Sequence, residues 1–106
     1  DSIRDPWYPM GNGNMLRTLD VGLHACHMLG MSRIDRSLEL ITENGAAALD
    51  LDEYGLDEGM PARCVVLQGA TPYEVLLGQR PVLASVRDGQ VLVRREASHP
   101  ETGLML

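Results

Sequence analysis

The chain has 106 residues, a net charge of -6 and a hydrophobic content of 44%. This length suits one domain, and no apolar run approaches the roughly 18 to 20 residues that a membrane-spanning helix needs. Its nine basic residues are spread along the chain without a cluster, which argues against a nucleic-acid or anionic-membrane surface. Small molecules or other proteins are therefore the expected partners.

Residues 1–13 contain two prolines and two glycines and no periodic apolar pattern, so they are expected to form a loop. Asn14 is the expected N-cap of a helix that follows this loop. Apolar or small residues then recur at spacings of three and four, which places them on one helical face. These residues are Met15, Leu16, Leu19, Gly22, Leu23, Cys26 and Leu29. Gly30 is expected to end the helix.

A second helix is expected from the capping-box-like run at residues 32–35, with Ile34, Leu38 and Ile41 as its apolar stripe. The pair at residues 44–45, Asn-Gly, is expected to weaken or break this helix before a short alanine-rich segment. The reason is that glycine costs about 1 kcal/mol relative to alanine inside a helix.

The pattern changes period after an acidic connector at residues 51–61. Residues 62–67 form a short β-rich run, and residues 72–77 suit one or two helical turns. Residues 81–95 predict a hairpin around Asp88-Gly89, because glycine adopts a positive φ without a steric penalty. The tail from residue 97 has no assignable structure.

The packing of the two helical stripes has two interpretations. In the first, the helices pack on the small sheet and form an α+β domain. In the second, they pack on strands that are absent from this sequence, because a sheet of three strands at best must also cover its own faces. The two cysteines, Cys26 and Cys64, have apolar neighbours, so we expect two reduced core thiols in a cytoplasmic protein.

The run DSIRDPWYPMGNGNML places two carboxylates, a hydroxyl and the single Trp within seven residues. Together with the following RTLDVGLHACHMLG, it resembles the segment after the last barrel strand of cytosine deaminases in the amidohydrolase superfamily. The D-P-W-Y-P run is the specific part of this resemblance. The similarity continues through LITENGAAALDLDEYGLDEGMPARCVVL and PVLASVRDGQVL, so it covers nearly the whole chain.

The resemblance implies an α/β fold: the C-terminal end of a metal-dependent (β/α)8 barrel plus part of a small β-sandwich. Residues 1–59 would be the last barrel loop and outer helices, residues 60–96 the strand and hairpin of the sandwich, and residues 97–106 a C-terminal tail. Taken alone, the chain would hold two to three helices, a short strand and a β-hairpin.

The resemblance also implies a site, because such barrels carry their active sites at the C-terminal ends of the strands. Asp1 would end the eighth strand, bind the catalytic divalent metal (Zn or Fe) and move a proton. Ser2 stands where the family has a second Asp that recognises the substrate. Trp7 matches the Trp that walls the base pocket. Asp5 is expected to stiffen the loop before Pro6.

The implied function is a hydrolytic deaminase of cytosine-like pyrimidines or other small nitrogen heterocycles, acting on C–N bonds. Its expected partners are the small substrate and the rest of the barrel or a completing chain, within a parent that could be a homo-oligomer. The 106 residues alone are expected to be inactive, because the other metal ligands lie outside them. The alternative is an autonomous, non-catalytic α+β interaction module.

His24, Cys26 and His27 offer ligand atoms on about one helical turn. A fourth ligand would have to come from distant Cys64 or from a carboxylate, and the resemblance puts this helix in the outer ring of the barrel. We therefore expect no metal site at this position.

Overall fold

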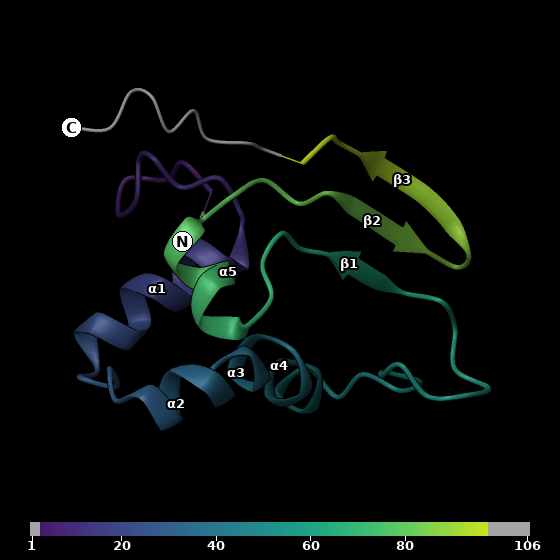
Figure 1. Cartoon of the computed structure of the whole chain (residues 1–106), viewed down its shortest axis with the longest axis horizontal. Coiled ribbons are helices and arrows are strands. Elements are labelled where there is room, and N and C mark those ends of the chain that lie inside the picture. The colour runs from purple at the N-terminus through teal and green to yellow at the C-terminus, as the bar shows by residue number, and fades with distance from the viewer. Residues whose placement is uncertain (1–2, 98–106) are drawn as a thin grey trace.

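The computed structural model describes residues 3–97. In chain order its elements are α1 (Met15–Ala25), α2 (Met31–Arg36), α3 (Leu38–Ile41), α4 (Glu43–Ala48), β1 (Cys64–Val66), α5 (Pro72–Gly78), β2 (Ala84–Arg87) and β3 (Gln90–Arg94). Helices gather on one side of the molecule and the strands on the other (Figure 1). The helix-then-sheet order agrees with the sequence, but the helical part is divided into more pieces than expected. None of the helices in residues 3–97 is long and apolar enough to cross a bilayer.

Helix α1 begins as predicted and ends early. The Asn14 side chain accepts a hydrogen bond from the Leu16 N–H at 3.0 Å, which confirms it as the N-cap. The helix stops at Ala25 because His27 adopts a left-handed φ of 54°, which an α-helix cannot contain. The prediction that Gly30 ends this helix is therefore wrong. Leu29 leaves the buried stripe and is 47% exposed.

The second predicted helix is interrupted at Ser37 and again at Thr42, instead of at residues 44–45. Thr42 has φ -118° and ψ -94°, and its hydroxyl donates to the Leu38 carbonyl at 2.7 Å. The non-helical ψ ends α3, and a side-chain bond of this kind weakens and bends a helix. Residues 44–45 lie inside α4, so the prediction that they break the helix is wrong; a Gly penalty of about 1 kcal/mol is tolerated. Gly30, with no side-chain cap, is the N-cap of α2, and Ser32 lies inside it.

The core lies between α1 and α5. Three leucines of α1, Leu16, Leu19 and Leu23, pack with Val75 and Leu76 of α5, and all five are at most 8% exposed. Partly buried residues surround them: Met28, Ile34, Leu38, Ile41 and Leu67. Both predicted stripes therefore meet each other and α5, a packing partner that neither interpretation of the sequence included. The sequence pattern alone did not show this packing, because α5 lies about fifty residues beyond α1.

The sheet is antiparallel, with strand order β1-β2-β3. Asp88 and Gly89 have φ values of 50° and 79°, which confirms the predicted two-residue hairpin turn. An Arg63–Asp88 ion pair at 2.9 Å fastens the turn to the segment before β1. Every residue of β3 is exposed, and Val91 and Leu92 are 59% and 58% exposed. The helices therefore do not cover this sheet as a simple α+β domain requires.

Both cysteines are free thiols. Cys64 is half-buried in β1, but Cys26 is exposed. The expectation of a buried core thiol is thus wrong for Cys26, because α1 ends one residue earlier.

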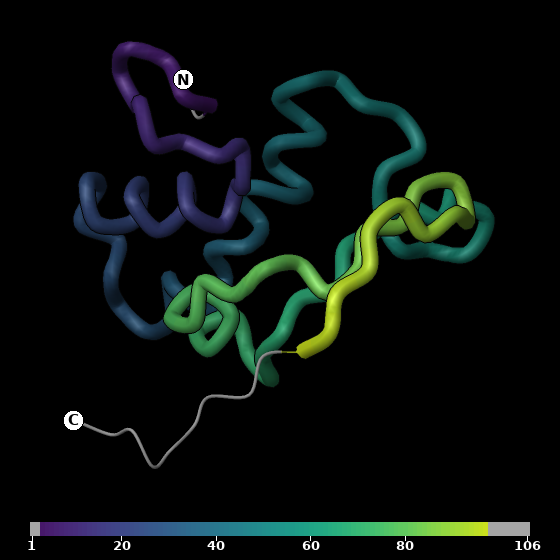
Figure 2. The backbone as a smooth tube through the Cα atoms, turned by 90° about the horizontal axis from the view of Figure 1, so that it is seen from above, coloured from purple at the N-terminus to yellow at the C-terminus, as the bar shows by residue number. Residues whose placement is uncertain are grey.

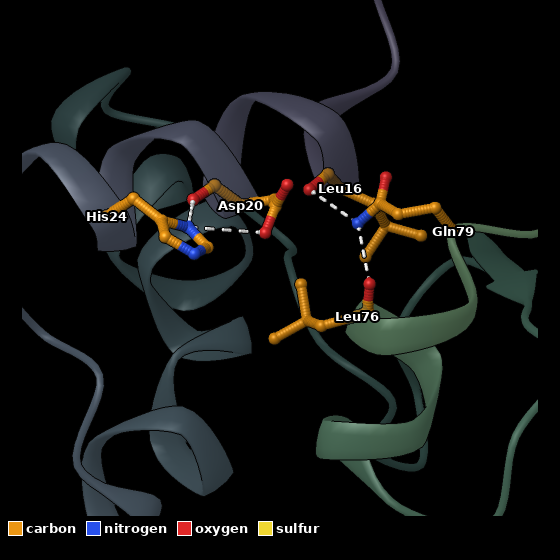
Figure 3. Close-up of polar contacts among 5 residues, drawn as sticks. All are labelled: Leu16, Asp20, His24, Leu76 and Gln79. Atoms are coloured by element: carbon orange, nitrogen blue, oxygen red, sulfur yellow. Dashed lines mark hydrogen bonds and ion pairs between the residues drawn. The ribbon is translucent and has the colours of Figure 1, made fainter.

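Gln79 joins the two helices of the core at their ends. It follows α5 with a left-handed φ of 46°. Its side-chain amide donates to the Leu76 carbonyl at 2.9 Å and to the Leu16 carbonyl at 3.3 Å (Figure 3). The start of α1 is therefore fixed to the end of α5 by a polar contact as well as by apolar packing.

Replacing Leu19 by Ala tests this small core. Leu19 is 5% exposed, so Leu19→Ala should lower the free energy of unfolding by about 2–5 kcal/mol. Leu56→Ala is the matched control: Leu56 is 83% exposed, and its loss should change stability by less than about 0.5 kcal/mol. Urea unfolding followed by circular dichroism gives both values. Equal losses in the two variants would contradict the assigned core.

Candidate functional site

The three predicted site residues lie at the start of the chain. Asp1 and Ser2 are outside the described residues, so their predicted roles stay predictions. Trp7 lies in the loop at residues 3–13, which stands beside α1 (Figure 2). Its side chain is 86% exposed. An indole held on the surface in this way is available to contact a ligand or another part of a protein.

The loop is closed on itself by its backbone. Ile3 and Asn12 form an antiparallel bridge, and the Arg4 N–H donates to the Gly11 carbonyl at 3.1 Å. The Gly11 N–H donates in turn to the Tyr8 carbonyl at 3.0 Å. Both limbs are thus tied together, and the segment that carries Trp7 lies between them.

Asp5 holds the turn around Trp7 from inside. One carboxylate oxygen accepts hydrogen bonds from the N–H groups of Trp7 at 2.8 Å and Tyr8 at 2.9 Å. This Asx-type turn suits Asp followed by Pro6, which presets φ for a turn. The prediction that Asp5 stiffens the loop is confirmed.

Arg17, in the first turn of α1, contacts the same loop. Its Nη1 donates to the Met10 carbonyl at 3.0 Å, and its guanidinium carbon lies 5.6 Å from the centre of the Tyr8 ring. Arg17 is not among the residues predicted from the sequence. A signal was present: Arg17 stands three residues after the N-cap, where the helix dipole favours an acid, and α1 has no acid in its first turn.

The described residues supply no metal centre. Within residues 3–97, no group of three or more His, Cys, Asp or Glu side chains could hold an ion. His24 Nδ1 lies 2.8 Å from the Asp20 carbonyl and 3.5 Å from its carboxylate, on the exposed face of α1 (Figure 3). The divalent ion that the family resemblance implies therefore does not fit residues 3–97 alone.

One cavity of about 350 Å³ lies elsewhere in the molecule. Residues of α2, α3 and α4 line it, among them Arg33, Arg36 and Glu39. Arg36 and Glu39 form an exposed ion pair at 3.3 Å. The loop at residues 3–13 contributes nothing to this cavity, so we do not include it in the candidate site.

Comparison with known proteins identifies relatives of this chain. No protein-family model matches the chain. N-isopropylammelide isopropyl amidohydrolase from Pseudomonas sp. (strain ADP) is 29% identical over 97 residues, which are 91% of this chain and 24% of that protein.

Solved structures give higher identity. The 5-methylcytosine deaminase from Klebsiella pneumoniae liganded with 5-fluorocytosine is 50% identical, with a TM-score of 0.88 over 97% of this chain and 25% of that one. The same deaminase liganded with phosphonocytosine is 51% identical, with a TM-score of 0.86 over 95% of this chain and 25% of that one. The chain thus spans about a quarter of the length of these relatives. The resemblance to the C-terminal segment of a cytosine deaminase-like amidohydrolase is confirmed.

Gly13 tests how the loop is closed. It has φ 76°, and a Cβ there would lie 3.1 Å from Ile3 Cγ1. Gly13→Ala should therefore strain the closed loop by about 1–3 kcal/mol and speed amide hydrogen exchange at Arg4 and Gly11.

Gly22→Ala is the control for this substitution. A Cβ at Gly22 meets no atom within 4 Å, so this change inside α1 should stabilise the helix by about 1 kcal/mol and leave the loop amides unchanged. If both variants left exchange at Arg4 and Gly11 unaltered, the loop would not be closed as described.

Proposed function

We propose that this chain, which resembles the C-terminal segment of cytosine deaminase-like amidohydrolases, forms part of a hydrolytic deaminase of cytosine-like pyrimidines or other small nitrogen heterocycles. The observation that supports the proposal most is the 50% identity to a 5-methylcytosine deaminase over 97% of this chain. In the proposed reaction, water adds to the ring carbon that bears the amine, and ammonia leaves.

Trp7 is proposed to contact the heterocycle. The face of an indole can stack on a planar ring, and base–aromatic stacking contributes about 1–3 kcal/mol per base. Two observations support this role: the side chain is 86% exposed, and Asp5 holds the backbone beneath it through two hydrogen bonds. A rigid support lets the ring bind without first losing the conformational entropy of the loop.

The roles of Asp1 and Ser2 are proposed from the resemblance alone. Asp1 is assigned as a ligand of a divalent metal, Zn or Fe, and as the group that transfers a proton between water and the leaving amine. Ser2 is assigned to the edge of the substrate. A hydroxyl cannot supply the charge of the family's second Asp, so heterocycles other than cytosine are included among the proposed substrates.

The 106 residues alone are proposed to be inactive. A catalytic metal needs roughly three or four ligands, and the chain spans about a quarter of its relatives. The rest of a barrel, or a completing chain, is the proposed partner. The exposed Val65, Val91 and Leu92 support this. Val91 and Leu92 are consecutive in β3, so they point to opposite faces of the sheet, and both faces carry exposed apolar side chains that a further part of the protein could cover. In this proposal, residues 1–59 belong to the barrel and residues 60–96 to the small β-sandwich.

A second candidate is an autonomous, non-catalytic interaction module. One observation favours it: the apolar stripe of α1 is buried by α5 within this chain. The two candidates differ in whether catalysis appears when the rest of the protein is present.

The deamination assay separates them. We expect the full-length protein that contains this sequence to release ammonia from cytosine, 5-methylcytosine or a related heterocycle, and the 106-residue chain to release none. Trp7→Ala should lower kcat/KM roughly 5- to 150-fold, and Trp7→Phe, which keeps an aromatic face, should lower it less. If the full-length protein released no ammonia from any of these heterocycles, the proposed function would be wrong.

A further inference from the structure

We propose that Arg17 is a positioning residue that holds the loop at residues 3–13 against α1 and thereby sets how tightly a heterocycle binds on Trp7. The proposal rests on the proposed function, since it takes Trp7 as the contact with substrate. It adds a residue that lies outside the D-P-W-Y-P run and touches the ligand only through the loop.

Arg17 contacts the limb of the loop that returns towards α1. Its Nη1 donates to the Met10 carbonyl at 3.0 Å, and its guanidinium lies over the Tyr8 ring at 5.6 Å. Tyr8 directly follows Trp7, and Met10 directly precedes Gly11, whose carbonyl closes the loop with Arg4. The Arg17 side chain thus contacts both ends of the segment at residues 8–10, which follows Trp7.

The Trp7 side chain depends on its backbone for its position. With 86% of it exposed, packing restrains the indole little. The carboxylate of Asp5 fixes the shape of the turn at residues 5–8, but it belongs to the loop and cannot fix the turn relative to the rest of the chain. Arg17 belongs to α1 and supplies that second restraint.

The backbone at Arg17 lies next to the buried core. Its neighbour Leu16 is 4% exposed, and the Leu16 carbonyl accepts from Gln79 of the α5 end (Figure 3). An arginine in the first turn opposes the helix dipole. The contacts with Tyr8 and Met10 compensate for that unfavourable placement.

Both contacts use the planar shape of the guanidinium. Its Nη1 donates to the Met10 carbonyl while its central carbon lies 5.6 Å from the centre of the Tyr8 ring, and the compact ammonium of a lysine cannot make both contacts from one position. Arg17→Lys should therefore keep the charge and restore only part of the effect. Arg17→Gln keeps a donor without the charge and serves if Arg17→Ala fails to fold.

Amide hydrogen exchange in the full-length protein tests the positioning directly. Arg17→Ala should speed exchange at Arg4, Tyr8 and Gly11 roughly tenfold, the loss expected for a hydrogen bond to a charged group, and leave Leu23 in α1 unchanged. The matched control is Arg33→Ala, an exposed arginine of α2 at the distant cavity, which should leave the loop amides unchanged. Unaltered loop exchange in Arg17→Ala, or equal acceleration in α1, would overturn the proposal.

Steady-state kinetics with cytosine and 5-methylcytosine give the second readout. We expect Arg17→Ala to raise KM roughly tenfold with kcat nearly kept, and Arg17→Lys to recover part of the loss. A fall in kcat with KM unchanged would count against positioning. If the unaltered protein deaminates neither these bases nor a related heterocycle, the proposed function fails, and hydrogen exchange alone then decides whether Arg17 holds the loop.

Discussion

The burial of three leucines of α1 against α5 is the interaction on which the described structure depends. Leu16, Leu19 and Leu23 meet two apolar residues of α5, and few other side chains of the described chain are buried. The same helix carries Asn14 at its start and Arg17 on its first turn, both next to the loop that presents Trp7. The core therefore fixes the helix from which Arg17 contacts the loop.

The sheet is much less buried than the helices. Leu67, directly after β1, packs against the buried cluster, whereas β3 is exposed along its whole length. A sheet of this kind gains little from burial by its own chain, and strands with open faces and edges invite association. Relatives about four times as long have further chain with which such a surface can be covered.

Local signals in the sequence predicted local structure well. The Asn14 cap, the Asp5 turn and the Asp88-Gly89 hairpin each involve a side chain or backbone angle that acts within a few residues. The predicted end of the first helix was wrong. His27 has a left-handed φ and ends the helix before the chain reaches Gly30. The packing of α1 on α5 joins residues far apart in the sequence, and periodicity shows only that a stripe is buried, never against what.

In the candidate site, too, the local features were predicted and the contacts between separate segments were not. The D-P-W-Y-P run drew attention to Trp7 and Asp5, which lie together on one stiff loop. Arg17 was not predicted: its place in the first turn of α1 is unusual for a base, but its contacts with Tyr8 and Met10 appear only when the loop folds back on the helix. Asp1 and Ser2 stay predictions from family resemblance.

Hydroxyl-radical footprinting tests most directly the claim that this chain is completed by the rest of a larger enzyme. Labelling of Val91, Leu92 and Leu56 would be compared between the 106-residue chain and the full-length protein, with buried Leu19 as the control for folding. We expect strong labelling of Val91 and Leu92 in the short chain, where both are exposed, and protection in the full-length protein. Equal labelling in the two would contradict it and would favour an autonomous module.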